Sequence, residues 1–137
     1  MLTSDDDASD GATIQVEPAQ RRVVITWAPG VPVFNPWMTT IEKLLSHPEF
    51  KPEFAVISDW RAATGSPDQA FVDAFLVFCQ SIRRARRLTG RWATVVAVTT
   101  DQSSLGRTAE LQASESGSET RVFTSFDEAL AWTSGQR

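Results

Sequence analysis

The stretch from residue 54 to residue 85 constrains the fold most, because it joins a strand-like run, a loop and a helix-like segment. Residues 54–58 are almost continuously apolar and have the length of a strand that is buried on both faces. Residues 59–65 carry polar groups and end in a glycine, so the chain leaves the sheet there. Ser66 then suits the cap of a helix, Pro67 suits its first position, and the helical pattern continues to about Leu88.

The same two patterns recur along the chain. Strands are predicted over residues 13–17, 23–27, 54–58, 91–98 and 121–124, and helices over 35–47, 67–88, from about 99 to 115, and 126–133. The first two strands form a hairpin, and Asn35 and Ser125 are predicted helix caps. Because strand–helix–strand crossovers are right-handed, strands added stepwise place their helices on one side of the sheet.

This order predicts an α/β fold. We expect a single sheet of about five mostly parallel strands after an N-terminal β-hairpin, with helices mainly on one face. The opposite face also needs a cover, because Val23 and Ile25 alternate with Val24, and Trp92 and Val96 alternate with other apolar residues. The hairpin, a terminal segment or a partner chain could provide that cover.

The long helix is more apolar than packing on one sheet requires. Its inner stripe contains Phe71, Phe75, Phe78, Ile82 and Ala85, and further apolar residues widen the stripe on both sides. A neighbouring helix or a second subunit could cover the surplus, and we expect a homodimer because exposed apolar area commonly marks an interface.

Length and composition predict one domain over residues 12–134, preceded by a disordered acidic lead-in over residues 1–11. No apolar run approaches the roughly 18 residues needed to cross a bilayer. The N-terminus is acidic where a secretory signal is basic, so we expect a cytoplasmic protein with no membrane contact. The net charge of −4 gives no general reason to expect nucleic-acid binding.

The chain offers little for catalysis or metal binding. Cys79 is the only cysteine and shares a helical face with core residues, and His47 is the only histidine. One cysteine and one histidine are too few for a typical zinc site, and they give little basis for a serine–histidine–carboxylate triad. We therefore expect no metal and no cofactor. Asp59 and Asp101, both predicted at strand ends, are the available carboxylate pairing, but nothing marks them as acid and base. We expect a protein that is not an enzyme.

Five arginines gather near the end of the long helix: Arg83, Arg84, Arg86, Arg87 and Arg91. Cations at a helix C-terminus are favoured by the helix dipole and usually form a solvated face. A site for phosphate or an acidic partner is the alternative.

Four segments in order, residues 44–54, 58–61, 90–95 and 122–132, resemble the SpoIIAA-like family, the STAS domains of anti-sigma factor antagonists and anion-transporter tails. The resemblance spans about residues 13–133 and is greatest to small stand-alone bacterial STAS-like proteins. In the antagonists an aspartate ends the strand before the long helix, a phosphorylatable serine follows it, and this surface docks on an anti-sigma kinase. Asp59 matches the aspartate, whereas Trp60 stands in the place of the serine. Ser66 is then the candidate phosphoacceptor, because a phosphate at a helix N-terminus meets free amides.

The resemblance implies a non-enzymatic regulatory or protein-interaction module. The expected binding surface is Asp59, Trp60, Arg61 and Ser66, at the carboxyl end of a central strand, and the partner is another protein, such as a regulatory kinase or signalling protein. Asp59 and Arg61 could instead pair with each other and hold the loop. A second candidate function is binding of a small apolar, lipid-like ligand, because the chain has five Trp and eight Phe.

Overall fold

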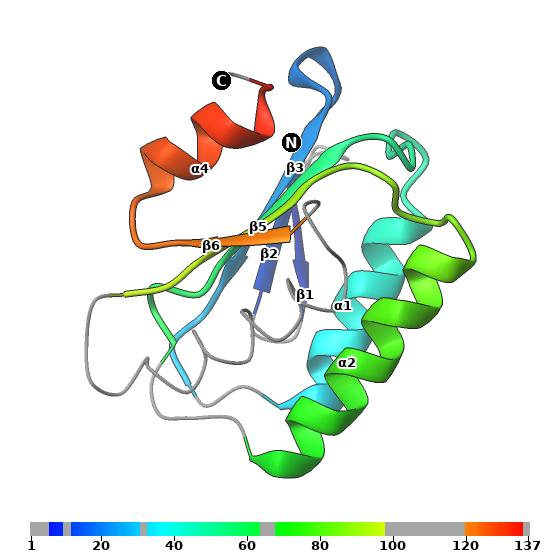
Figure 1. Cartoon of the computed structure of the whole chain (residues 1–137), viewed down its shortest axis with the longest axis vertical. Coiled ribbons are helices and arrows are strands. Elements are labelled where there is room, and N and C mark those ends of the chain that lie inside the picture. Colours follow the sequence, from blue (N-terminus) through cyan, green and yellow to red (C-terminus); the bar gives the residue numbers. More distant parts are fainter. Residues whose placement is uncertain (1–5, 10–11, 31–32, 64–67, 98–119, 136–137) are drawn as a thin grey trace.

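The computed structural model describes residues 6–9, 12–30, 33–63, 68–97 and 120–135. These residues form one six-stranded sheet whose strands are neighbours in chain order (Figure 1). The strands are β1 (Asp6–Ser9), β2 (Ala12–Glu17), β3 (Arg22–Trp27), β4 (Ala55–Asp59), β5 (Trp92–Val95) and β6 (Thr120–Phe123). β1, β2 and β3 pair antiparallel, and β3 to β6 pair parallel, so the predicted α/β class with a hairpin before parallel strands is confirmed.

The first strand lies inside the segment that the sequence predicts to be a disordered lead-in. Asp6–Ser9 pair with β2 in an antiparallel register that brings Ser9 opposite Ala12. Strand pairing uses backbone amides and carbonyls, so a polar segment can add a strand at a free sheet edge without apolar side chains.

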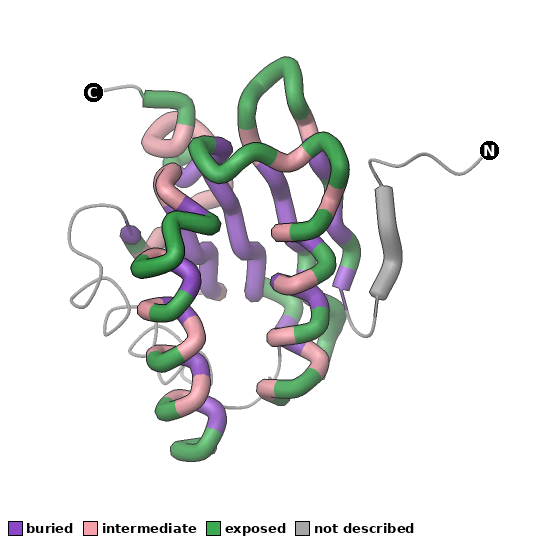
Figure 2. Tube along the Cα trace, turned by 90° about the vertical axis from the view of Figure 1, so that its right-hand side faces the viewer, coloured by how far each residue is buried: buried purple, intermediate pink, exposed green. Residues whose placement is uncertain are grey.

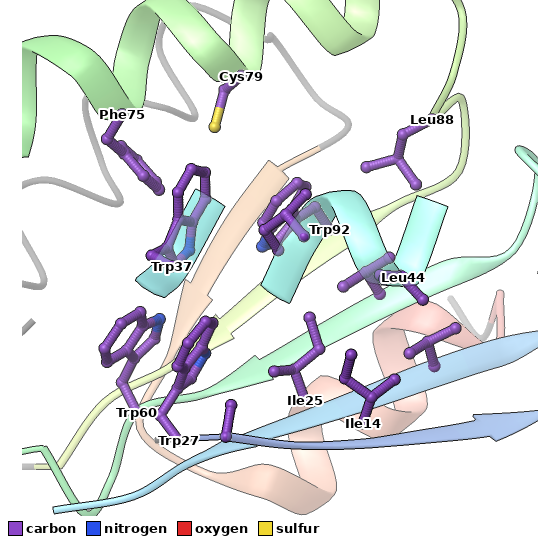
Figure 3. Packing of buried hydrophobic residues seen from close by; sticks show 14 of the residues in the cluster. Ile14, Ile25, Trp27, Trp37, Leu44, Trp60, Phe75, Cys79, Leu88 and Trp92 are labelled. Carbon is purple, nitrogen blue, oxygen red and sulfur yellow. The ribbon is translucent and has the colours of Figure 1, made fainter. Parts of the chain in front are cut away.

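Two helices pack side by side on one face of the sheet, as the right-handed crossover rule predicts (Figures 1 and 2). They are α1 (Phe34–Leu45) and α2 (Gln69–Arg84), which follow β3 and β4. Trp37 of α1 lies 4.8 Å from Phe75 of α2 between ring centroids, and both rings belong to the main core. That core also contains Ile14, Ile25 and Trp92 from the sheet (Figure 3).

The C-terminal helix α4 (Phe126–Thr133) covers the opposite face (Figure 1). A second core cluster there joins Val24, Ile57 and Val95 to Ala129, with Phe126 and Leu130 packed around them. The sequence left the hairpin, a terminal segment or a partner chain as possible covers of this face. Over β4, β5 and β6 the cover is a terminal segment, α4. The expectation of helices mainly on one face holds for α1 and α2 but not for α4, which follows the last strand and is not a crossover.

The predicted ends of α2 are wrong at both termini. The helix begins at Gln69 and its cap is Asp68, whose carboxylate accepts a hydrogen bond of 2.8 Å from the Phe71 amide. It ends at Arg84 because Arg86 adopts the left-handed conformation with φ 57°. The Asp68 carboxylate satisfies a first-turn amide, and its charge is favourable at the positive end of the helix dipole.

The other helix predictions vary in outcome. α1 begins at Phe34 with Val33 at the cap position, so the Asn35 cap is wrong. In α4 the Ser125 hydroxyl accepts a hydrogen bond of 3.2 Å from the Glu128 amide, as predicted. The helix predicted to end near residue 115 lies outside the described residues.

Candidate interaction surface

The candidate surface is built on a paired carboxylate and guanidinium at the carboxyl end of β4. Asp59 is the last residue of β4, and β4 lies between β3 and β5 in the parallel part of the sheet. The Arg61 Nε donates to Asp59 Oδ1 at 2.9 Å, and Arg61 Nη2 donates to Oδ2 at 2.9 Å. The Arg61 amide also donates to Oδ1, at 3.1 Å. Asp59 and Arg61 therefore hold each other and the turn between them.

This pair fixes one half-exposed cation. The Asp59 side chain is 10% exposed, whereas the Arg61 side chain is 47% exposed. The hydrogen bonding of Arg61 to the Asp59 carboxylate, which accepts, raises the pKa of Arg61, and the charges of Asp59 and Asp127 act in the same direction. A bidentate, charge-assisted pair also restricts the guanidinium to one orientation.

Arg61 connects the end of β4 to the start of α4. Its guanidinium carbon lies 5.1 Å from the centroid of the Phe126 ring, within the range of a cation–π interaction. Phe126 is partly buried and Asp127 is exposed. We call the exposed atoms of Arg61, Phe126 and Asp127, with Asp59 beneath them, the β4–α4 surface. Phe126 and Asp127 were not predicted, because no local pattern connects them with residues so distant in the chain.

Trp60 does not belong to this surface, and its prediction as a surface residue is wrong. It is 5% exposed and stacks on Trp27 at 4.4 Å between ring centroids, with planes 10° apart (Figure 3). The Trp27 indole donates to the Ser58 hydroxyl at 2.8 Å. Ser58 and Trp60 are two residues apart in extended backbone, so they point to the same face, toward α1 and α2. Trp60 also falls on the same face as Phe54 and Val56, which belong to the same core cluster, and this period of two is the sequence signal for its burial.

Ser66 lies outside the described residues, so its role as a phosphoacceptor stays a prediction. Asp101 also lies outside them. The structure thus brings together Asp59 and Arg61 from the predicted set and buries Trp60 beside them.

Most arginines near the end of α2 have defined intramolecular partners. Arg83 donates to the carbonyls of Leu88 and Gly90, at 3.2 and 2.9 Å, and Arg91 donates to the Trp132 carbonyl. Arg87 donates to both carboxylate oxygens of Glu42, at 2.8 and 3.3 Å. Because these arginines are engaged within the chain, the contacts argue against the alternative of an anion site in the basic segment.

The described residues contain no group of three or more potential metal ligands. Burial raises the pKa of the Cys79 thiol well above its ordinary range, as expected for a core thiol. No helix among the described residues is long and apolar enough to cross a membrane.

Comparisons of the chain with protein-family models, with curated proteins and with solved structures find no match.

Proposed function

We propose that this protein is a non-enzymatic, STAS-like regulatory module that binds another protein through the β4–α4 surface. The observation that carries the proposal is Arg61, a 47% exposed side chain held by two hydrogen bonds to Asp59. A side chain that is already fixed loses little conformational freedom on binding, and arginine is among the residues enriched at interface hot spots. The hairpin followed by parallel strands in chain order supports the STAS resemblance.

The chemistry of the surface suggests what the partner presents. The Arg61 guanidinium has donors beyond those that its hydrogen bonds to Asp59 use, and they lie beside the Phe126 ring, with the negative charge of Asp127 close to them. A matching partner has a carboxylate or carbonyl for Arg61 and an apolar side chain for Phe126. A regulatory kinase or another signalling protein is the class that the family resemblance implies.

The arrangement of Asp59 supports a module without catalytic activity. Both of its carboxylate oxygens accept hydrogen bonds from Arg61. A general base needs an oxygen within reach of a substrate proton, whereas these oxygens already anchor a neighbouring side chain.

A photo-crosslinking experiment tests the proposed surface. A photoreactive residue at Ala62, which is exposed and adjacent to Arg61, is activated in cells of the native host. We expect a discrete crosslinked protein that disappears when Arg61→Ala is added. A photoreactive residue at Gln20, exposed in the turn between β2 and β3, is the matched control and should not yield that product. Crosslinking that is unchanged by Arg61→Ala, or no discrete product at Ala62, would contradict the proposal.

The phosphorylation of Ser66 is a separate expectation. The Asp68 carboxylate already accepts a hydrogen bond from an amide at the start of α2. A phosphate on Ser66 would therefore add negative charge two residues from an existing carboxylate in the sequence. Intact mass spectrometry of the protein from its host, with Ser66→Ala as the control, shows whether the phosphate is present.

The ligand-binding alternative draws no specific support from the described residues. The aromatic residues that suggested it pack mainly against one another: Trp27 with Trp60, Phe71 with Phe75, and Trp37 with four phenylalanines. Their number is explained by the core that they fill.

A further inference from the structure

The outer side of α2 carries an exposed stripe that neither the sheet nor α1 covers. Val77 is 67% exposed, while Phe71, Phe75, Cys79 and Ile82 of the same helix are buried. The exposed residues recur at helical spacing along one line: Ala70, Asp73, Val77, Ser81 and Arg84. Figure 2 shows exposed segments along the outward side of both helices. We call these five residues the α2 stripe.

An open, mainly apolar hollow of about 500 Å³ adjoins the stripe. Its lining consists of Phe34 of α1 and of Asp73, Ala74, Val77, Phe78 and Ser81 of α2. Val77 therefore projects beside a depression of the kind that could receive a valine. The protrusion and the depression lie on the same surface, which is the requirement for a contact between identical molecules.

The charges of two α2 stripes also complement each other when the two helices run antiparallel. Asp73 and Arg84 are separated by 11 residues, or roughly 16 Å along a helix axis, so they do not meet within one chain. In an antiparallel pair of α2 helices that crosses near Val77, Asp73 of each copy lies within about one turn of Arg84 of the other. Among the residues that the structure describes, Arg84 forms no ion pair, and Asp73 accepts a hydrogen bond from Gln69 of its own helix.

We infer that two copies of this chain associate through antiparallel α2 stripes, with Val77 of each copy in the hollow of the other. The two-fold axis passes close to Val77, and two symmetric Asp73–Arg84 pairs flank it. In the antiparallel arrangement the positive end of each helix dipole also lies near the negative end of the other, which is favourable. A contact made mainly by one helix from each copy belongs to the small interfaces, so the dimer dissociates at roughly micromolar concentration.

Charge reversal tests the contact directly by sedimentation equilibrium over a range of protein concentrations. Asp73→Arg alone and Arg84→Asp alone each place like charges opposite one another, and each should raise the dimer Kd by about tenfold or more. The double variant, Asp73→Arg with Arg84→Asp, restores opposite charges and should return the Kd close to the wild-type value. Because these residues are too distant to interact within one chain, rescue by the double variant is specific to the antiparallel dimer.

Val77→Arg should remove the dimer, since it places a charge in the apolar centre of the contact. Gln20→Arg, an exposed substitution outside α2, is the matched control and should leave the Kd unchanged. Thermal unfolding of each variant verifies that the monomer fold is kept. A wild-type monomer at every concentration overturns the inference, as does a dimer that is insensitive to these substitutions or a double variant without rescue. Native mass spectrometry that detects a bound apolar molecule on the monomer would also overturn it.

Discussion

Trp60 and Arg61 are adjacent in the chain but their side chains lie on opposite faces of the sheet. Trp60 packs in the core under α1 and α2, whereas Arg61 lies over Phe126 of α4. A Trp60→Ala substitution therefore removes a buried ring, at a cost of about 3–5 kcal/mol, and tests folding rather than binding. Arg61 is the informative residue for the proposed interaction, because its side chain is accessible and its removal leaves the Trp27–Trp60 stack intact.

Arg86 occupies a position where glycine is strongly preferred. The Arg86 amide donates to the Arg83 carbonyl at 3.0 Å, the Arg87 amide donates to the Ile82 carbonyl at 2.9 Å, and Arg86 has φ 57°. This is the Schellman arrangement at a helix C-terminus, and a side chain in the left-handed region costs about 1 kcal/mol. Arg86→Gly should therefore raise the free energy of unfolding by about 0.5–1 kcal/mol, measured by urea denaturation.

Arg84→Gly is the comparison for that prediction. Arg84 is the last residue of α2 and has helical backbone, so glycine there should lower the stability. Equal effects of the two substitutions would show that the φ of Arg86 is not the cause.

At the scale of elements, the loops before β4 and β5 approach each other closely at Gly90. A Cβ atom at this position would lie 2.3 Å from the Phe54 carbonyl oxygen and 2.5 Å from that of Glu53. The Gly90 amide also donates to the Pro52 carbonyl at 3.1 Å. Because the opposing atoms are backbone, no side-chain movement can relieve the contact.

Gly90→Ala should consequently destabilise the protein by about 1–3 kcal/mol, through a forced shift of the β4–β5 connection. The midpoint of urea denaturation measures this effect. Gly135→Ala is the control, because a Cβ atom added there would meet no neighbouring heavy atom within 4 Å and only the φ of +85° opposes the substitution. A larger loss at residue 135 than at residue 90 would contradict the steric explanation.

An ion pair links the C-terminal part of α1 to the turn that follows α2. The Glu42 carboxylate accepts from Arg87, and this hydrogen bond lowers the pKa of Glu42 below its ordinary value of 4.5. A lowered folded-state pKa means that the unfolded chain binds the proton more tightly, so the pair stabilises the fold above that ordinary value. The stabilisation is lost as the pH falls through the folded-state pKa.

Glu42→Gln should reduce the free energy of unfolding at pH 7 by about 0.5 kcal/mol, a small value because both side chains are about two-fifths exposed and screened by solvent. The difference from wild type should shrink as the pH falls through the folded-state pKa of Glu42 and vanish once the carboxylate is protonated in both states. Urea denaturation over a series of pH values from neutral into acid provides the measurement. A difference that persists in acid would assign the effect to packing.

At the scale of the whole molecule, the sheet is covered differently on its two faces. α1 and α2 cover one face, α4 covers β4 to β6 on the other, and the outer residues Thr13, Gln15 and Thr26 of the hairpin are exposed and polar. This distribution places the β4–α4 surface and the α2 stripe on opposite sides of the sheet. The proposed partner contact and the proposed contact between two copies therefore use different surfaces and do not compete.

The order of β2 to β6 with α1, α2 and α4 could be predicted from the sequence because it depends on local periodicity, whereas β1 lies in a polar segment that was predicted to be disordered. Apolar residues on both alternations of β3 and β5 also predicted that both faces of the sheet are covered, and the two core clusters confirm this. Helix ends were predicted less well. The cap of α2 is Asp68, a residue type that caps helices about as readily as serine, and the left-handed turn at Arg86 has no glycine to signal it.

The sequence by itself determined the α/β class, the parallel strand order and the one-sided placement of α1 and α2, because periodicity and crossover handedness are local rules. Only the tertiary structure decided that α4 covers the second face, that Trp60 is buried on Trp27, and that Arg61 meets Phe126. These contacts join residues far apart in the chain, and their choice depends on which apolar surfaces remain uncovered once the sheet has formed.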